Sequence, residues 1–187
     1  MSASSRNEMK LVILDRDGVI NEESRDFIRS PDDLHPIEGS LEAIARFTRA
    51  GVHVAVATNQ SGLARGYFDI DTLNRIHAFL SSRAAAVGGR IDVIAFCPHG
   101  PDAGCACRKP EPGLLRSLAD RFSVHLQSVP FVGDSLRDLY AAERAGARPV
   151  LVRTGNGNEV ARALPPAFSS VPIYPDLLAA SEALLSP

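Results

Sequence analysis

The chain alternates short apolar runs with stretches of helical periodicity, and this alternation restricts the folds open to it. Five runs are apolar or β-branched almost throughout, as expected of strands that are buried on both faces. These runs are Leu11–Leu14, Val52–Ala57, Ile91–Phe96, Val129–Val132 and Pro149–Val152. Strands of this kind, separated by helices, form a parallel sheet whose two faces are both covered.

Four stretches between these runs carry apolar residues at helical spacing: Ser40–Ala50, Ile70–Val87, Gly113–Arg121 and Ser135–Ala145. Three of them are followed by a glycine, which commonly ends a helix. Because 187 residues suit one domain, we expect residues 1–187 to form a single α/β domain, a Rossmann-like parallel sheet with helices on both faces. In such sheets the ligand binds beyond the carboxyl ends of the strands.

The composition excludes several classes of function. The net charge of -2 offers no basic field for gripping nucleic acid. No apolar run approaches the ~20 residues of a membrane-spanning helix, and the opening MSASSRNEMK lacks the apolar segment of a signal peptide. We therefore expect a cytoplasmic protein without nucleic-acid or membrane partners. We also expect a monomer, with residues 1–9 flexible.

All three cysteines lie close together, between Cys97 and Cys107. An odd number of cysteines argues against a disulfide framework, whereas their clustering around His99 suggests a metal. Three thiolates and one imidazole suit tetrahedral zinc, and a set that leaves no position for water is structural rather than catalytic. We therefore predict that Cys97, His99, Cys105 and Cys107 bind one structural Zn²⁺. The alternative is three reduced thiols beside a solvent-facing histidine.

Polar side chains follow the apolar runs directly. Asp15 and Asp17 follow the first run, Thr58 and Asn59 the second, and Asp134 the fourth. A single such aspartate would be a helix N-cap or a turn residue, but carboxylates that converge from separate strands need a cation among them. Hard oxygen ligands with open geometry suit Mg²⁺. Bound Mg²⁺ would let an anionic aspartate attack an anionic phosphate.

Lys109 is one of only two lysines in the chain. It stands in the segment RKPEP, just before the Gly113–Arg121 stretch, where a prolyl turn could aim its ammonium group at a phosphoryl oxygen. The rigid setting favours this interpretation over an exposed surface lysine.

Four motifs in this order resemble those of the haloacid-dehalogenase-like (HAD-like) phosphatases: Asp15-Arg16-Asp17-Gly18-Val19, Thr58-Asn59, Lys109-Pro110, and Gly133-Asp134 with Asp138. Longer stretches, DRDGVIN, TNQSGLARGYF, CRKPEPG and FVGDSLRDL, are similar to the branch that contains heptose-bisphosphate and histidinol-phosphate phosphatases. The similarity runs from about Lys10 to Arg153. Asp138 is then either a supporting partner of the site or a surface helix residue, and we favour the former.

The resemblance implies a role for each motif residue. Asp15 would be the nucleophile that forms an aspartyl-phosphate, and Asp17 the general acid and then the general base. Mg²⁺ would bind the carboxylates of Asp15 and Asp134 and the main-chain carbonyl of Asp17. Thr58 and Lys109 would steady the transferred phosphoryl group.

The chain leaves no room for a cap domain between Gly18 and Thr58 or between Gly62 and Arg108. We therefore expect a capless fold with an open site, in which three short loops choose the substrate: Asn21–Ser30, Ser61–Phe68 and the zinc loop Cys97–Arg108. The substrate contacts that we expect are Ser24, Arg25, Asp26, Asn59, Gln60, Ser61, Arg65 and Arg108.

The charges in these loops leave two substrates open. Arg25, Arg29, Arg65 and Arg108 would suit a second phosphate, which guanidinium groups bind bidentately. Histidinol carries an ammonium group instead, and the acids of the first loop would suit it. These acids are Glu22, Glu23 and Asp26.

The resemblance implies a Mg²⁺-dependent phosphatase that acts on a small phosphorylated sugar. It would remove the C7 phosphate of D-glycero-D-manno-heptose 1,7-bisphosphate and leave heptose 1-phosphate for ADP-heptose and lipopolysaccharide core synthesis. One alternative is a histidinol-phosphate phosphatase. Another is a non-catalytic zinc-containing binding domain, against which the complete set of Asp15, Asp17, Lys109 and Asp134 argues, because crowded carboxylates are costly.

Overall fold

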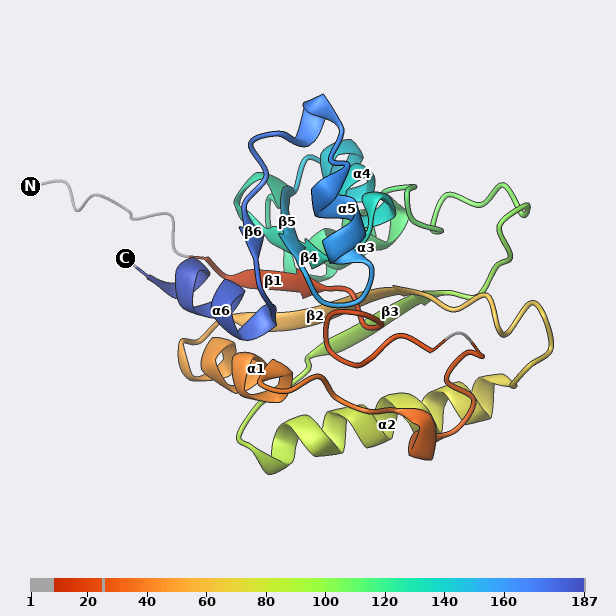
Figure 1. The fold of residues 1–187 in the computed structure, drawn as a ribbon. Coiled ribbons are helices and arrows are strands. Elements are labelled where there is room, and N and C mark those ends of the chain that lie inside the picture. Colours follow the sequence, from red (N-terminus) through yellow and green to blue (C-terminus); the bar gives the residue numbers. More distant parts are fainter. Residues whose placement is uncertain (1–8, 25, 187) are drawn as a thin grey trace, which may run out of the picture.

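The computed structural model describes residues 9–24 and 26–186. Figure 1 shows one six-stranded sheet, in which all neighbouring strands pair in parallel in the order β3-β2-β1-β4-β5-β6. The strands are β1 (Leu11–Leu14), β2 (His53–Asn59), β3 (Val93–Cys97), β4 (Pro130–Gly133), β5 (Arg148–Val152) and β6 (Ile173–Tyr174). The predicted parallel sheet is confirmed. Except for Met9, the segment expected to be flexible, residues 1–9, lies outside the described residues.

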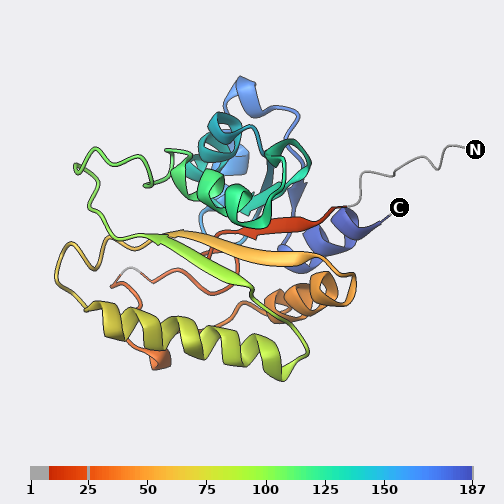
Figure 2. The same cartoon turned by 180° about the vertical axis from the view of Figure 1, so that it is seen from behind.

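Helices cover both faces of this sheet, as Figures 1 and 2 show from opposite sides. On one face lie α1 (Ser40–Arg49), α2 (Ile70–Ala86) and α6 (Leu177–Leu185). On the other lie α3 (Gly113–Phe122), α4 (Leu136–Ala145) and α5 (Gly157–Arg162). The fold therefore consists of three layers, helices on either side of a sheet.

Strand β1 shows why its run has no polar position. Val12 and Leu14 pack in the core cluster beneath α1 and α2, whereas Leu11 and Ile13 pack in the cluster beneath α3 and α4. All four residues are fully buried, because alternate side chains of a strand enter opposite layers. Each such side chain contributes about 1.5–3 kcal/mol through its burial.

The strand order places the site. The residues that follow β1 and β4 lie side by side, because these two strands are neighbours in the sheet. The strand order reverses between them: β2 and β3 lie beyond β1, whereas β5 and β6 lie beyond β4. Such a reversal opens a crevice at the carboxyl ends of the strands. The segment from β1 to β2 adds only a short 3₁₀ turn (Pro31–Asp33) and α1, and β2 is joined to β3 through α2 alone. Among the described residues, neither connection holds a cap domain.

Three elements were not expected from the sequence: β6, α5 and α6. β6 is two residues long and α5 six, too short for a periodic pattern to emerge. Strand β2 also runs two residues further than predicted, so that Thr58 and Asn59 are its last residues rather than the start of a loop. No helix among the described residues is long and apolar enough to span a membrane.

Candidate active site

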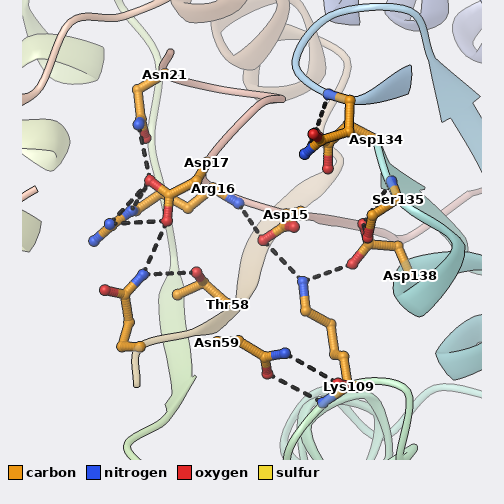
Figure 3. Close-up of polar contacts among 12 residues, drawn as sticks. Asp15, Arg16, Asp17, Asn21, Thr58, Asn59, Lys109, Asp134, Ser135 and Asp138 are labelled. Atoms are coloured by element: carbon orange, nitrogen blue, oxygen red, sulfur yellow. Dashed lines mark hydrogen bonds and ion pairs between the residues drawn. The ribbon is translucent and has the colours of Figure 1, made fainter. Parts of the chain in front are cut away.

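A cavity of about 410 Å³ opens at the carboxyl ends of β1, β2 and β4. Asp15 and Asp17 enter it from the end of β1, Thr58 from β2, and Asp134 from the end of β4. The structure therefore brings together the groups that the sequence placed at separate strand ends. Figure 3 shows these side chains together with Lys109, which directly follows the Cys97–Arg108 loop.

Lys109 lies between two carboxylates. Its Nζ is 2.8 Å from Asp15 Oδ1 and 2.7 Å from Asp138 Oδ1, and its side chain is 2% exposed. Burial opposes the charged form of Lys109, but Asp138 and Asp15 outweigh it and raise its pKa. Likewise the pKa of Asp138 is lowered despite its burial, chiefly by Lys109. The lysine is therefore a fixed cation beside Asp15 and not an exposed surface lysine.

Asn59 fixes the backbone of Lys109. The amide nitrogen of its side chain donates to the Lys109 carbonyl at 3.0 Å, and its Oδ1 accepts from the Lys109 N–H at 3.0 Å. Asn59 lines the cavity, as expected of a substrate contact, but both polar atoms of its side chain are occupied by this pairing. Its contribution is to hold the lysine.

Asp138 is fully engaged at both oxygens. While Oδ1 contacts Lys109, Oδ2 accepts from the Ser135 hydroxyl at 2.6 Å and from the Ser135 N–H at 3.1 Å. These last contacts belong to the capping box at the start of α4. Asp138 therefore supports the site from behind by holding Lys109, rather than acting as a surface helix residue.

The positive charges near Asp15 and Asp134 do not offset the burial of these two carboxylates. Burial raises the pKa of Asp15 well above its usual range, although Lys109 opposes this. Burial, reinforced by the charge of Asp138, raises the pKa of Asp134 to about 7. Oxygens of Asp15, Asp134 and Asp138 lie within 4.8 Å of one another. Because Asp138 already contacts Lys109 and Ser135, we assign the cation to Asp15 and Asp134, whose oxygen ligands fit Mg²⁺.

The backbone around Asp134 is closely packed. Gly18 and Gly155 both adopt positive φ, +81° and +55°, and a Cβ atom on either would come within 2.2 Å of Asp134 Oδ2. The same oxygen accepts from the Asn156 N–H at 2.8 Å. A side chain at either glycine would therefore displace the carboxylate that could bind the cation.

Asp17 points away from Lys109 and is held by three neighbours, as Figure 3 shows. Arg16 donates to both of its oxygens, at 2.9 and 3.0 Å, and Asn21 donates to Oδ1 at 2.9 Å. Gln60 donates to Oδ2 at 3.1 Å and to the Thr58 hydroxyl at 2.9 Å. Gln60, predicted as a substrate contact, thus ties Asp17 to Thr58.

The cysteines and His99 converge as predicted. Five pairs among the three Sγ atoms and His99 Nδ1 are separated by 3.2 to 3.6 Å, and none of the cysteines forms a disulfide. Ligands at ~2.3 Å from a tetrahedral zinc ion are separated by about 3.8 Å, close to these values. The four residues, Cys97, His99, Cys105 and Cys107, could therefore hold one zinc ion. They close the Cys97–Arg108 loop, which Lys109 directly follows.

Three arginines also line the cavity: Arg65, Arg108 and Arg137, which together we call the arginine wall. Among the described residues none of the three pairs with an acid. Burial lowers the pKa of Arg108, and the charges of Arg137 and Arg65 lower it further. Three guanidinium groups that repel one another at one wall fit a ligand with an additional anionic group.

Only some of the other predicted substrate contacts line the cavity. Ser24 and Ser61 line the cavity, whereas Asp26 faces a neighbouring surface hollow with Arg29. Arg25 lies outside the described residues. Seven other residues that line the cavity were not among the expected site residues: Arg16, Glu23, Phe27, Ile28, Pro101, Ser135 and Arg137. Of these, the sequence pointed to Glu23 only as an acid that would suit histidinol. Arg137 precedes Asp138 in SLRDL, so its place in the first turn of α4 was a signal that pointed to the cavity.

The raised pKa values predict how a divalent cation stabilises the fold. Because folded Asp134 titrates at about 7, above an unfolded aspartate, the folded state without cation binds more protons and loses stability as the pH rises toward 7. Mg²⁺ should reverse this loss only where the carboxylates are ionised. We expect saturating Mg²⁺ to raise the melting temperature by about 5–10 °C at pH 8 and by far less at pH 5.5. Calorimetry of dialysed protein measures both shifts.

The variant Asp134→Asn serves as the control for this experiment. It replaces an anionic oxygen ligand with a neutral amide and removes the titrating group, so its melting temperature should respond much less to Mg²⁺ at either pH. Equal shifts at pH 5.5 and pH 8 would show that the cation binds elsewhere.

The fold and the site define a class of protein. Carboxylates beyond the central strands of a parallel sheet, next to a buried lysine, are what the sequence motifs led us to expect of a HAD-like hydrolase, and the described residues contain no cap domain. The sequence profile of the HAD-hydrolase-like family matches residues 106–180. The fold and this match indicate a hydrolase of the HAD-like class.

Comparisons with known proteins narrow the class to a family. The D-glycero-beta-D-manno-heptose-1,7-bisphosphate 7-phosphatase of Bordetella bronchiseptica is 59% identical over 151 residues, 81% of this chain and 84% of the relative. The protein of the same name from Pseudomonas aeruginosa is 51% identical over 176 residues, 94% of this chain and 97% of the relative. This chain belongs to the family of D-glycero-D-manno-heptose-1,7-bisphosphate 7-phosphatases.

A solved structure of one relative has the same fold. The crystal structure of the D,D-heptose 1,7-bisphosphate phosphatase from B. bronchiseptica, complexed with magnesium and phosphate, matches with a TM-score of 0.90 and 54% identity. The match covers 95% of this chain and 98% of the other. That relative therefore binds magnesium and phosphate on the same fold.

Proposed function

We propose that this protein removes the C7 phosphate of D-glycero-β-D-manno-heptose 1,7-bisphosphate in a Mg²⁺-dependent reaction. The carrying observation is the cavity itself, with Asp15, Lys109 and Asp134 at its floor and three arginines at its wall. The floor suits the phosphoryl group that is transferred, and the wall suits a second phosphate that is not. The relatives above carry the name of this reaction.

Asp15 begins the reaction. One carboxylate oxygen attacks the phosphorus of the C7 phosphate while the bond from phosphorus to the sugar oxygen breaks, and an aspartyl-phosphate forms. Asp17 gives its proton to the departing sugar oxygen. Asp17 then takes a proton from water, whose oxygen attacks the phosphorus and releases inorganic phosphate from Asp15. The product is heptose 1-phosphate.

The remaining residues hold charge during these steps. Lys109 stays protonated between Asp15 and Asp138 and faces the transferred oxygens, and the Thr58 hydroxyl lies beside Gln60 at the same end of β2. A magnesium ion held by Asp15, Asp134 and the main-chain carbonyl of Asp17 would neutralise phosphoryl oxygens and so lower the repulsion between nucleophile and substrate.

The product suggests a place in metabolism. Heptose 1-phosphate with a free C7 hydroxyl is a substrate for nucleotide activation, and the resulting ADP-heptose supplies the lipopolysaccharide core. We propose that this protein serves that route, in the cytoplasm.

Steady-state kinetics on two substrates test this function. We expect kcat/KM for the β-anomer of heptose 1,7-bisphosphate to exceed that for histidinol phosphate at least about a hundredfold, or ~3 kcal/mol, because arginines can bind the second phosphate. The α-anomer provides a third comparison. Equal efficiency on heptose bisphosphate and histidinol phosphate would defeat the proposal and favour the histidinol enzyme.

The arginine wall gives a second test. We expect Arg108→Ala and Arg137→Ala each to lower kcat/KM for heptose 1,7-bisphosphate about tenfold or more, mainly through KM, since each removes a guanidinium partner of the C1 phosphate. For heptose 7-phosphate, which lacks that phosphate, the loss should stay within about threefold.

The exposed α3 residue Arg121 is the matched control. Arg121→Ala removes the same charge outside the cavity and should leave both substrates unaffected. If Arg108→Ala and Arg137→Ala impaired the two heptose phosphates equally, the arginines would not discriminate the second phosphate.

A further inference from the structure

Arg16 is fully buried, with 1% of its side chain exposed, and it is the one buried arginine among the described residues. A buried guanidinium needs partners for its donors. Its Nε and Nη2 donate to the carboxylate of Asp17, and its Nη1 lies 3.3 Å from His77 Nε2. The carboxylate of Asp17 and one histidine thus occupy the two ends of a single buried cation.

His77 takes no part in the reaction described above. It lies in the middle of α2, on the buried side of the helix, and its ring packs against Phe96, with 5.8 Å between centroids. Burial, reinforced by the charge of Arg16, lowers the pKa of His77 to about 4. The ring is therefore neutral at pH 7. Since a guanidinium group only donates, Nε2 of His77 must be the acceptor.

These contacts form a chain from α2 into the cavity. His77 fixes Nη1 of Arg16, and Arg16 in turn fixes both oxygens of Asp17. We propose that His77 is a positioning residue for proton transfer by Asp17 and that it acts through Arg16. This inference rests on the proposed function, which gives Asp17 the role of general acid and base.

The physical reason is the cost of an unmade hydrogen bond. Without an acceptor at position 77, Nη1 of Arg16 would be left buried and unpaired, and the guanidinium would turn toward other partners. Asn21 and Gln60 would still contact Asp17, one at each oxygen. They would keep its carboxylate nearby but no longer fix its plane, on which alignment with the leaving oxygen depends.

Two substrates with different leaving groups can distinguish a positioning role of His77 from a purely structural one. A sugar oxygen needs a proton as it departs, whereas 4-nitrophenolate departs without one. Because kcat/KM reports the steps up to the first irreversible bond cleavage, misplacement of Asp17 should lower kcat/KM for the sugar phosphate but not for 4-nitrophenyl phosphate. Loss of fold, metal or phosphate binding would lower both values together.

Two His77 variants carry the test. We expect His77→Leu to lower kcat/KM for heptose 1,7-bisphosphate about thirtyfold while that for 4-nitrophenyl phosphate stays within about threefold. His77→Gln places an amide oxygen where Nε2 accepts, and should keep both values within about threefold of wild type. Ile76→Ala, a core change at the neighbouring α2 position, should lower the melting temperature and leave the ratio of the two values unchanged.

Each outcome decides the inference. Equal losses on both substrates, no loss, or a His77→Gln variant as impaired as His77→Leu would overturn it. If His77→Leu does not fold, Arg16→Met must give the same split between the two substrates.

Asp17→Asn separates failure of this inference from failure of the proposed function. It should show the same split in larger measure. If Asp17→Asn impaired both substrates equally, Asp17 would not be the acid, and the proposed mechanism would fail. Were histidinol phosphate the better substrate, it would replace the heptose ester in the comparison, since its leaving oxygen also needs a proton.

Discussion

Asp15→Asn should abolish phosphate release, with kcat lowered by about four orders of magnitude or more. An amide cannot form the acyl-phosphate bond, and the substitution also removes one oxygen ligand of the cation. The fold should survive, because burial already disfavours the ionised form of Asp15 and raises its pKa. Phosphate release under saturating Mg²⁺ measures the effect.

The covalent intermediate can be tested directly as well. Acid-quenched wild-type protein should carry one phosphoryl group by mass spectrometry during turnover, and Asp15→Asn should carry none. Asp120→Asn, at an exposed position of α3, is the matched control and should keep full activity. Activity of Asp15→Asn within about tenfold of wild type would show that the reaction does not pass through an aspartyl-phosphate.

The centre of the fold follows from the sequence because its strands carry a strong and local signal. Every side chain of β1 is buried, so no polar residue interrupts the run. At the edge of the sheet the signal fails. β6 pairs with β5 through two residues, Ile173 and Tyr174, and its place is decided by packing against α6 rather than by its own pattern.

The site residues likewise differ in how far the sequence predicts them. Asp15, Thr58 and Asp134 lie within one or two residues of the ends of buried strands, so the parallel sheet alone determines that they meet. The rule also extends to β5. Asn156 lies four residues beyond the end of that strand and donates its N–H to Asp134 Oδ2, although the sequence did not predict it as a site residue.

Other residues reach the site from helices, where spacing alone does not tell what the side chain faces. His77 lies on the same face of α2 as Leu73, Ile76 and Leu80, all of them buried. A histidine on an apolar helix face indicates a buried partner, but its identity, Arg16, depends on how α2 packs against the end of β1. The capping role of Asp138 likewise depends on where α4 begins.

Loss of the predicted zinc site should be nearly as damaging as loss of the proposed nucleophile, Asp15. We expect Cys107→Ser to reduce zinc from about one equivalent to less than about 0.2 and to lower kcat/KM about a thousandfold, since the metal supplies the folding free energy of such a loop. The loop starts at Cys97, the last residue of β3, and ends at Arg108, directly before Lys109. Most of its side chains are partly or fully exposed, so it has no apolar core of its own.

Loss of zinc should affect the cavity through two neighbouring residues, Arg108 and Lys109. Arg108 is held by one hydrogen bond from its Nη1 to the His99 carbonyl, at 3.2 Å. Lys109 keeps its pairing with Asn59 only while the loop returns to the end of β2. When the thiolates release the metal, both cations lose the support that places them opposite the substrate. The acids Asp15 and Asp134 come from the sheet instead, so the rise in melting temperature with Mg²⁺ at pH 8 should persist in Cys107→Ser.

Metal analysis and kinetics on protein purified without chelator decide the matter. Asp102→Asn, an exposed change within the same loop, should keep both zinc and activity. Less than about 0.2 equivalents of zinc in wild-type protein, with activity unaffected by a strong zinc chelator in excess Mg²⁺, would rule out an essential zinc. If zinc is present, the chelator should lower the activity with the time course of zinc release, because catalysis then depends on the fold of the loop and not on the metal as a reactant.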